Sequence, residues 1–394
     1  MDEDEGRGQR IVYDGKRMRK AIARRNVDYN GPLLKYKLEG RFGSVQKHPL
    51  YSIYVPPVTG ACSLSNSLTV NLAHTSINKI RTPINTIRYA PNGRRLISGA
   101  ATGEFTLWNG FSFNFETILQ AHDSALRSMC WTPHGDYLLS GDQIGVVKYW
   151  QPSMNNLQLI EAHKEAVRDI SFAPRGNKFC TASDDGTIKV FDFQTAKEER
   201  SLSGHGWDVR VGQWHKRHAL IASGGKDNLV KLWDPRGKEI TTLHIHKNTV
   251  LCLKWTNDGE CILTGGKDQV IKMFNLRAMK EEFTHKGHQK EATALCVHPC
   301  LDSLFVSGGG EGSVYIWQKH NEYPVRVIPD AHQKTIWSMD FHPIGHTLAT
   351  SSVDNTVKFW IRPRPTAEEG ALDTVDSVDV EQERIPGVGS DLQE

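Results

Sequence analysis

The sequence predicts an all-β protein built as a closed ring of seven repeated sheets, a seven-bladed β-propeller. Three observations predict it: an aromatic residue recurs every 41–43 residues, a histidine precedes it at a nearly constant distance, and short strand-like segments with tight turns lie between them. A period in the low forties with Asp/Gly turns is typical of WD repeats, each of which supplies one four-stranded blade. The recurring aromatics are Trp108, Trp150, Phe191, Trp233, Phe274, Trp317 and Trp360.

The recurring histidine lies 28 residues before its aromatic in five repeats and 29 before it in the sixth. In WD repeats an aspartate six residues before the aromatic bonds this histidine and ties the strands of a blade together. We therefore assign a structural role to His163, Asp185, His205, Asp227, Trp233, His246, Asp268, His332, Asp354 and Trp360, and the same role to the repeat histidines His122 and His288.

Two repeats depart most from this pattern. Repeat 1 has no such histidine and carries Thr102 at the aspartate position, and repeat 2 carries Ile144 there. Repeat 6 keeps an acid, Glu311. Blades 1 and 2 are therefore expected to be the least regular.

A closed ring needs a fourth strand for its last blade. The last repeat ends at Trp360, and only a short segment separates it from an acidic stretch. The apolar segment SLTVNLAH, residues 67–74, precedes repeat 1 and can supply that strand, which would remove two exposed sheet edges. We thus expect a basic N-terminal arm and partner-docking extension at 1–60, the propeller at 61–364, and an acidic disordered tail at 365–394.

Several classes of protein are disfavoured. No apolar run of about 18 residues and no secretory leader occur, so no membrane association is expected. The segments SGGKD (223–227) and TGGKD (264–268) lack the Ser or Thr of a phosphate-binding loop and occupy one repeat position, so they indicate turns. His215, His218, His342 and His346 are interpreted as turn and surface residues. The pair Cys296 and Cys300 lacks zinc-knuckle spacing, so we expect no metal, no cofactor and no enzymatic activity.

The charge distribution is strongly asymmetric. From Arg7 to Arg25 there are eight Lys or Arg residues and one acid, whereas residues 367–394 contain nine acids and one Arg. A basic run of this kind suits a solvated tail, a nuclear import signal or an arm that binds a polyanion. Composition leaves the three open.

Particular stretches resemble one family. DGKRMRKAIARR, VDYN, GEFTLWNG, FNFETILQAHD, VKYWQPSMNN, EATALCVHP and AHQKTIWSMDFHPIGH are similar in order and spacing to the WD-repeat subunit of the nuclear mRNA cleavage and polyadenylation factor. The resemblance covers about residues 11–364 and implies a nuclear, non-catalytic subunit. It also implies recognition of the AAUAAA polyadenylation signal in pre-mRNA beside a zinc-finger subunit. A large multi-propeller scaffold subunit would dock within about residues 28–60.

The resemblance also implies a set of RNA-binding residues. Tyr13, where the family commonly has Phe, and Phe115 would sandwich a non-standard U·A pair. The basic positions that would contact the RNA are Lys16, Arg17, Arg19, Arg24 and Lys79. Stacked bases with neutralised phosphates are the usual mode of single-stranded RNA recognition.

The segment FSFNF places Phe111, Phe113 and Phe115 at alternate positions, which predicts one strand with all three on one face. Phe111 and Phe113 are expected to belong to the core of this outer strand, and Phe115 to the RNA site.

Two alternatives remain at this stage. The chain could be a protein-only WD-repeat scaffold whose arm is an import signal or docking peptide. It could also be a substrate receptor of a cullin ubiquitin ligase, since LWDPR (232–236) fits the short W-D-x-R pattern of those receptors.

Overall fold

The computed structural model describes residues 11–13, 18–20, 67–78 and 81–362. The rest of the predicted arm and the predicted tail therefore lie outside the described residues. None of the described segments forms a helix long and apolar enough to cross a membrane. The described chain contains thirty strands.

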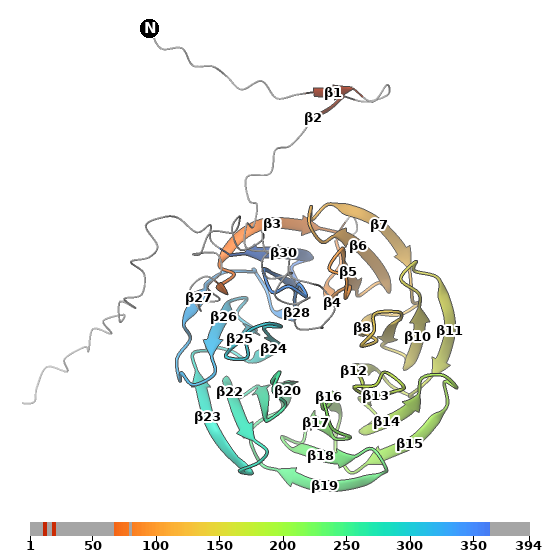
Figure 1. Ribbon diagram of the computed structural model, residues 1–394, viewed down its shortest axis with the longest axis vertical. Coiled ribbons are helices and arrows are strands. Elements are labelled where there is room, and N and C mark those ends of the chain that lie inside the picture. Colours follow the sequence, from red (N-terminus) through yellow and green to blue (C-terminus); the bar gives the residue numbers. More distant parts are fainter. Residues whose placement is uncertain (1–10, 14–17, 21–66, 79–80, 363–394) are drawn as a thin grey trace, which may run out of the picture.

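Seven antiparallel sheets of four strands each are arranged in a ring around a central channel (Figure 1), which confirms the predicted seven-bladed propeller. From the inner to the outer strand, blades 1 to 3 consist of β4 (Ile84–Tyr89), β5 (Arg95–Ala100), β6 (Glu104–Asn109) and β7 (Phe115–Gln120); β8 (Leu126–Trp131), β9 (Leu138–Asp142), β10 (Val146–Trp150) and β11 (Asn156–Glu161); and β12 (Val167–Phe172), β13 (Lys178–Ser183), β14 (Thr187–Asp192) and β15 (Glu198–Ser203).

Blades 4 to 6 follow in the same order: β16 (Val209–Trp214), β17 (Ile221–Gly225), β18 (Val230–Asp234) and β19 (Lys238–Leu243); β20 (Val250–Trp255), β21 (Cys261–Gly266), β22 (Val270–Asn275) and β23 (Lys280–Lys286); and β24 (Ala292–Val297), β25 (Leu304–Gly309), β26 (Val314–Gln318) and β27 (Arg326–Ile328). Blade 7 contains β28 (Ile336–Phe341), β29 (Thr347–Ser352), β30 (Thr356–Ile361) and, as its outer strand, β3 (Asn71–Ile77).

The strand β3 closes the ring, as predicted, because it comes from the N-terminal side of the chain and pairs with β30 near the other end (Figure 1). Their register runs from Asn71 opposite Ile361 to Ile77 opposite Thr356. The strand begins at Asn71 rather than at residue 67. Leu68 and Val70 instead pack against the apolar core between blades 6 and 7.

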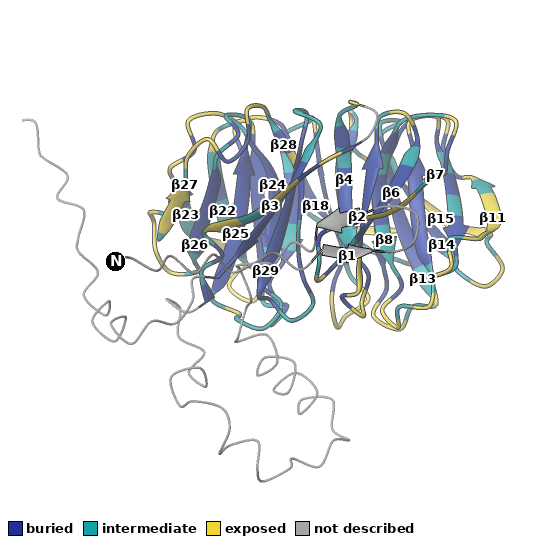
Figure 2. Ribbon diagram, turned by 90° about the horizontal axis from the view of Figure 1, so that it is seen from above, coloured by how far each residue is buried: buried dark blue, intermediate teal, exposed yellow. Residues whose placement is uncertain are grey.

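The recurring aromatics are buried between blades and hold the strands within each blade together. In Figure 2 the inner strands are mostly buried, whereas outer strands such as β11, β23 and β27 are largely exposed. Five of the aromatics are tryptophans whose indole N–H donates to a Ser or Thr on the second strand of the same blade. The bonded pairs are Trp108 with Ser98, Trp150 with Ser140, Trp233 with Ser223, Trp317 with Ser307 and Trp360 with Thr350.

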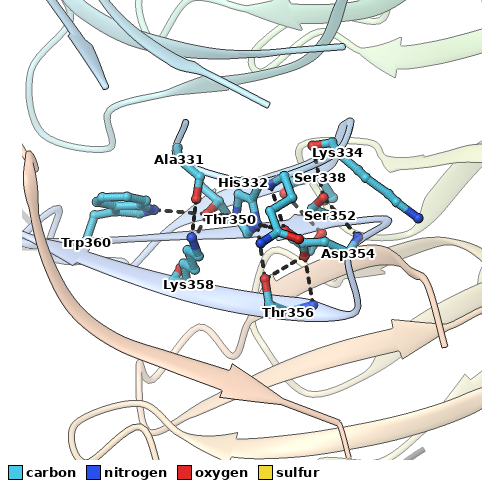
Figure 3. A network of polar contacts seen from close by, with 12 residues as sticks. Ala331, His332, Lys334, Ser338, Thr350, Ser352, Asp354, Thr356, Lys358 and Trp360 are labelled. Carbon is cyan, nitrogen blue, oxygen red and sulfur yellow. Dashed lines mark hydrogen bonds and ion pairs between the residues drawn. The ribbon is translucent and has the colours of Figure 1, made fainter. Parts of the chain in front are cut away.

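In blade 7 the tryptophan bond continues into the histidine–aspartate pair (Figure 3). His332 Nδ1 lies 3.0 Å from Asp354 Oδ2, and its Nε2 lies 2.7 Å from Thr350 Oγ1, which also accepts the Trp360 indole N–H. Because a carboxylate only accepts, Nδ1 carries the proton and Nε2 accepts from the Thr350 hydroxyl. Burial opposes the shift, but bonds from His332 and Thr356 hold the pKa of Asp354 well below its usual range.

The same geometry recurs in blades 3, 4 and 5. The pairs and their Nδ1–Oδ2 distances are His163 with Asp185 at 2.8 Å, His205 with Asp227 at 2.7 Å, and His246 with Asp268 at 2.8 Å. In these blades the network lies at one end, where the outer strand of the preceding blade leads into the inner strand.

Blade 2 keeps the histidine–aspartate pair although Ile144 occupies the position where the repeat pattern has the aspartate. Its structure is therefore more regular than its sequence predicts. Asp142, two residues earlier, takes the place of the missing aspartate: its Oδ2 lies 3.1 Å from His122 Nδ1. Its Oδ1 accepts backbone N–H groups of the turn, including that of Val146 at 2.8 Å. Ile144 itself is 61% exposed. In blade 6 the acid is Glu311, at 3.1 Å from His288.

Three histidines link neighbouring blades at the opposite face, which we call the A–B face because it carries the turns between the first and second strand of each blade. His215, His298 and His342 donate from Nε2 to carbonyl oxygens of the next blade, those of Gly259, Gly345 and Gly93. Each ring is buried. The interpretation of His215 and His342 as surface residues is therefore wrong, because their ring nitrogens satisfy backbone groups inside the blade junctions. His346 is buried as well, whereas His218 is exposed.

Candidate RNA interface

The candidate site is built around Phe115, the first residue of the outer strand of blade 1. Phe115 is opposite Trp108 in the β6–β7 register, at a β-bulge, and its ring meets the Trp108 ring edge-on with centroids 6.0 Å apart. The side chain remains 51% exposed. The ring is thus in contact with protein on one side, while about half of the side chain is available to a stacking partner.

The loop before Phe115 is anchored to the A–B face. The Gly110 N–H donates to the Arg94 carbonyl oxygen at 2.7 Å, and the Asn109 side-chain oxygen accepts the N–H of Ser112 at 2.8 Å. After Phe115, Glu116 is held by Arg95 at 2.7 Å. Neighbours on both sides therefore fix the backbone that presents the ring.

The prediction that three phenylalanines share one strand face is wrong. Phe113 has φ +54°, a left-handed conformation that breaks the alternation, and the strand begins only at Phe115. Phe113 turns inward and stacks on Phe359 of blade 7 with centroids 4.4 Å apart, so it does belong to the core. Phe111 points outward, is 62% exposed and contacts the His342 ring.

The closing strand of blade 7 contacts this same loop. His74 stacks against Phe113 with centroids 6.4 Å apart, and the Ser76 hydroxyl donates to the Phe113 carbonyl oxygen at 3.3 Å. The end of β3 therefore lies beside the loop that leads to Phe115. Lys79 follows three residues after Ser76 but is itself outside the described residues.

Only the backbone of part of the arm is described. Ile11–Tyr13 (β1) and Met18–Lys20 (β2) form a two-stranded antiparallel pair in which Tyr13 is opposite Met18 and Arg19 opposite Val12. Lys16, Arg17 and Arg24 lie outside the described residues. Tyr13 and Arg19 are thus brought together on one hairpin, and their relation to Phe115 stays a prediction.

One cation near this loop was not anticipated from the sequence. Arg94 is exposed on the A–B turn of blade 1 and forms no ion pair with another described residue. The turn signal Pro91-Asn92-Gly93 could have located it, but nothing in the sequence shows that the turn bonds the loop before Phe115.

The described residues offer little for metal or thiol chemistry. No group of three or more His, Cys, Asp or Glu side chains among them is arranged to hold a metal ion. The described cysteines are free, and burial raises the pKa of Cys252 and of Cys296 to about 12, so these thiols stay protonated near neutral pH.

Comparison with known proteins identifies the repeats. The family model described as WD domain, G-beta repeat matches six segments, each running from the outer strand of one blade through the third strand of the next. The unmatched seventh unit is the one whose outer strand is β3. The six segments are residues 113–151, 154–192, 196–234, 237–275, 279–318 and 323–360.

Proteins named polyadenylation factor subunit 2 match most of the chain. The one from Neurospora crassa is 40% identical over 403 residues, covering 92% of this chain and 61% of the relative. That from Gibberella zeae is 42% identical, covering 79% of this chain and 55% of the relative. That from Schizosaccharomyces pombe is 42% identical, covering 90% of this chain and 77% of the relative. The chain thus spans little more than half the length of the first two relatives. It belongs to the WD-repeat family whose curated members in these fungi are named polyadenylation factor subunit 2.

Proposed function

We propose that this chain is a non-catalytic, nuclear subunit of the machinery that cleaves and polyadenylates pre-mRNA. The names of its relatives and the WD-repeat fold support a scaffold role in mRNA 3′-end processing. Its partners in this proposal are a large multi-propeller scaffold subunit and a zinc-finger subunit.

The chain would also help to bind the AAUAAA signal. Phe115 and Tyr13 stack on the two sides of a U·A pair, while Lys16, Arg17, Arg19, Arg24 and Lys79 neutralise phosphates. The observation that carries this proposal is the half-exposed ring of Phe115, supported on one side by Trp108 and mounted on an anchored loop. Aromatic stacking contributes roughly 1–3 kcal/mol per base.

The test is a binding experiment on the chain reconstituted with the two partner subunits. The wild-type assembly should bind an AAUAAA oligonucleotide more tightly than one with a point-mutated hexamer. Lys16→Ala/Arg17→Ala/Arg19→Ala, and separately Phe115→Ala, should each weaken binding. Phe111→Ala is the matched control, since this exposed ring precedes Phe115 in the same loop but is given no stacking role.

The salt dependence gives an independent readout. For single-stranded RNA the logarithm of affinity should fall with the logarithm of salt with a slope near −0.7 per neutralised phosphate. Affinity that is independent of salt, or unchanged in both variants, would leave only the protein-only scaffold.

The ubiquitin-ligase alternative gains no support from the LWDPR segment. The Trp233 indole is buried and donates to Ser223, and Asp234 accepts the backbone N–H of Arg236 at 2.9 Å to close a turn. Contacts within the blade thus account for Trp233 and Asp234, the first two residues of the pattern.

A further inference from the structure

A hollow on the A–B face lies between blades 3 and 4 and has a volume of about 560 Å³. Its walls come from the A–B turns of both blades, from the outer strand β15 and from the turn after β18. We call it the arginine cleft because Arg175, Arg200, Arg217 and Arg236 line it.

The four guanidinium groups are exposed and form no ion pair with any described residue. Two acids also line the cleft, against five cations, the four arginines and Lys178. Glu199 is paired with Lys178 at 2.5 Å, and Asp234 accepts the Arg236 backbone N–H. The cleft therefore presents an excess of positive charge to an incoming ligand.

Two arginines that line the hollow at the channel mouth on the other face behave differently. Arg168 lies 2.5 Å from Asp184, and Arg210 lies 3.0 Å from Asp208. Those guanidinium groups are already neutralised by carboxylates of the protein. The four arginines of the cleft lack such a carboxylate partner among the described residues and lie together in one hollow.

The buried Trp214 is also among the residues that line the cleft. Trp214 is 6% exposed, and its indole Nε1 forms no hydrogen bond within the described structure. Ala173, Pro174 and Trp214 also line a hollow of about 460 Å³ at the mouth of the central channel, where Lys216 and Lys254 lie. The two hollows thus share a wall.

We propose that the arginine cleft binds the RNA that flanks the hexamer. This rests on the proposed function, since the loop that presents Phe115 is anchored to the same face. Guanidinium groups bind phosphates in a planar, two-pronged geometry, and the volume of the cleft is large enough for a nucleotide. RNA carries one charge per nucleotide, whereas the acidic stretch of this chain carries nine acids in 28 residues, which is a poorer match to four clustered arginines.

The experiment compares the AAUAAA hexamer with the same hexamer extended by ten uridines on its 5′ or its 3′ side, using the reconstituted assembly. One extension should tighten binding by the wild type. Arg200→Gln/Arg217→Gln should remove that gain, a loss of about tenfold or more, and leave hexamer affinity unchanged. Its salt slope for the extended RNA should be less negative by about 1.4, for two phosphates. Arg326→Gln, a change of an exposed arginine on the outer strand of blade 6, should keep the gain.

Three results would overturn the inference: no gain from either extension, a gain that survives in the double variant, or hexamer binding lost together with it. If the extended RNA bound more tightly only after removal of residues 367–394, the acidic stretch would be the occupant of the cleft in the full chain, and the inference would fail for that chain. If the wild type fails to select the hexamer, the proposed function fails. In that case, RNA binding by the cleft is tested with decauridine without the hexamer. Decauridine must bind the wild type and Arg326→Gln more tightly than the double variant.

Discussion

The Nε2 atom of His298 lies 3.0 Å from the carbonyl oxygen of Gly345, so the A–B turn of blade 6 is hydrogen-bonded to the A–B turn of blade 7. The Nδ1 atom accepts the backbone N–H of Leu301 at 3.0 Å, which leaves neither ring nitrogen unsatisfied. His298 therefore serves as a neutral bridge between two blades, and His215 and His342 repeat the arrangement at two other junctions.

Gly345→Ala should destabilise the protein by about 2–4 kcal/mol, because two unfavourable effects coincide. Gly345 has φ +84°, and an added Cβ would lie 2.5 Å from Cε1 of His298. Urea denaturation measures the change in the free energy of unfolding. Gly206→Ala is the control, since nothing lies within 4 Å of its Cβ position and its φ is not in the left-handed region. Equal stability of the two variants would contradict the bridge.

Stability should fall as the pH drops below about 6.5. Burial lowers the pKa of His298, and that of His346, to about 4, against an unfolded value near 6.5. The unfolded chain then binds more protons than the native one between these values, so each histidine costs about 2 kcal/mol at pH 5 and nothing above neutrality. Urea melts at pH 7.5 and 5.0 test this, and His298→Gln should flatten the dependence. A pH-independent midpoint over this range would exclude it.

Asp142→Ala should cost about 2–4 kcal/mol, because it leaves His122 and several N–H groups of the turn without their acceptor. Ile144→Ala, at the position where the repeat pattern expects the aspartate, should be nearly neutral, since that side chain is exposed. Thermal melts of the two variants distinguish the roles. If Ile144→Ala proved as costly as Asp142→Ala, the conclusion that Asp142 takes the role of the aspartate expected at position 144 would be refuted.

Phe113 and Phe115 should separate stability from binding. Phe113→Ala removes a buried ring that stacks on Phe359 and should cost about 3–5 kcal/mol of unfolding free energy. Phe115→Ala should cost less than about 1 kcal/mol, since it loses one edge-on contact with Trp108, yet weaken RNA binding about tenfold. Denaturation and RNA titration on the same samples check both halves, and a folded Phe115→Ala with full affinity would rule out stacking.

Removing residues 1–66 should leave the ring closed, whereas removing residues 1–77 should open blade 7. The second truncation deletes β3, exposes the edge of β30 and uncovers the apolar surface that β3 covers. A drop in melting temperature and faster proteolysis are expected only for the longer truncation. Similar melting of the two proteins would show that β3 is dispensable.

The periodicity of the sequence predicted the seven blades and the closing strand, because each blade repeats the same buried aromatic and the same tight turns. It did not predict Asp142, since a carboxylate two residues away can reach the same histidine once the turn folds back on itself. Nor did it predict the role of His298, which is defined by a carbonyl 47 residues away in the next blade. Such contacts depend on how blades pack, which a repeat pattern does not encode.

The site was only partly predictable for a similar reason. The RNA-binding role of Phe115 stays a prediction, and the alternation that grouped it with Phe111 and Phe113 fails at one left-handed residue, Phe113. The four arginines of the arginine cleft are spread from Arg175 to Arg236 in the sequence. They line one hollow only because blades 3 and 4 are neighbours in the ring.

The pairing of β3 with β30 also bears on how the protein is made. The ribosome synthesises β3 before every other strand of the ring, and its partner β30 emerges only after nearly three hundred further residues. Until then, the first ring strand to be synthesised has no sheet to join, and the rest of the circle has to assemble as an open arc. The strand β3 therefore stays unpaired until the last blade has been synthesised, and the ring closes only when β30 is available to pair with it.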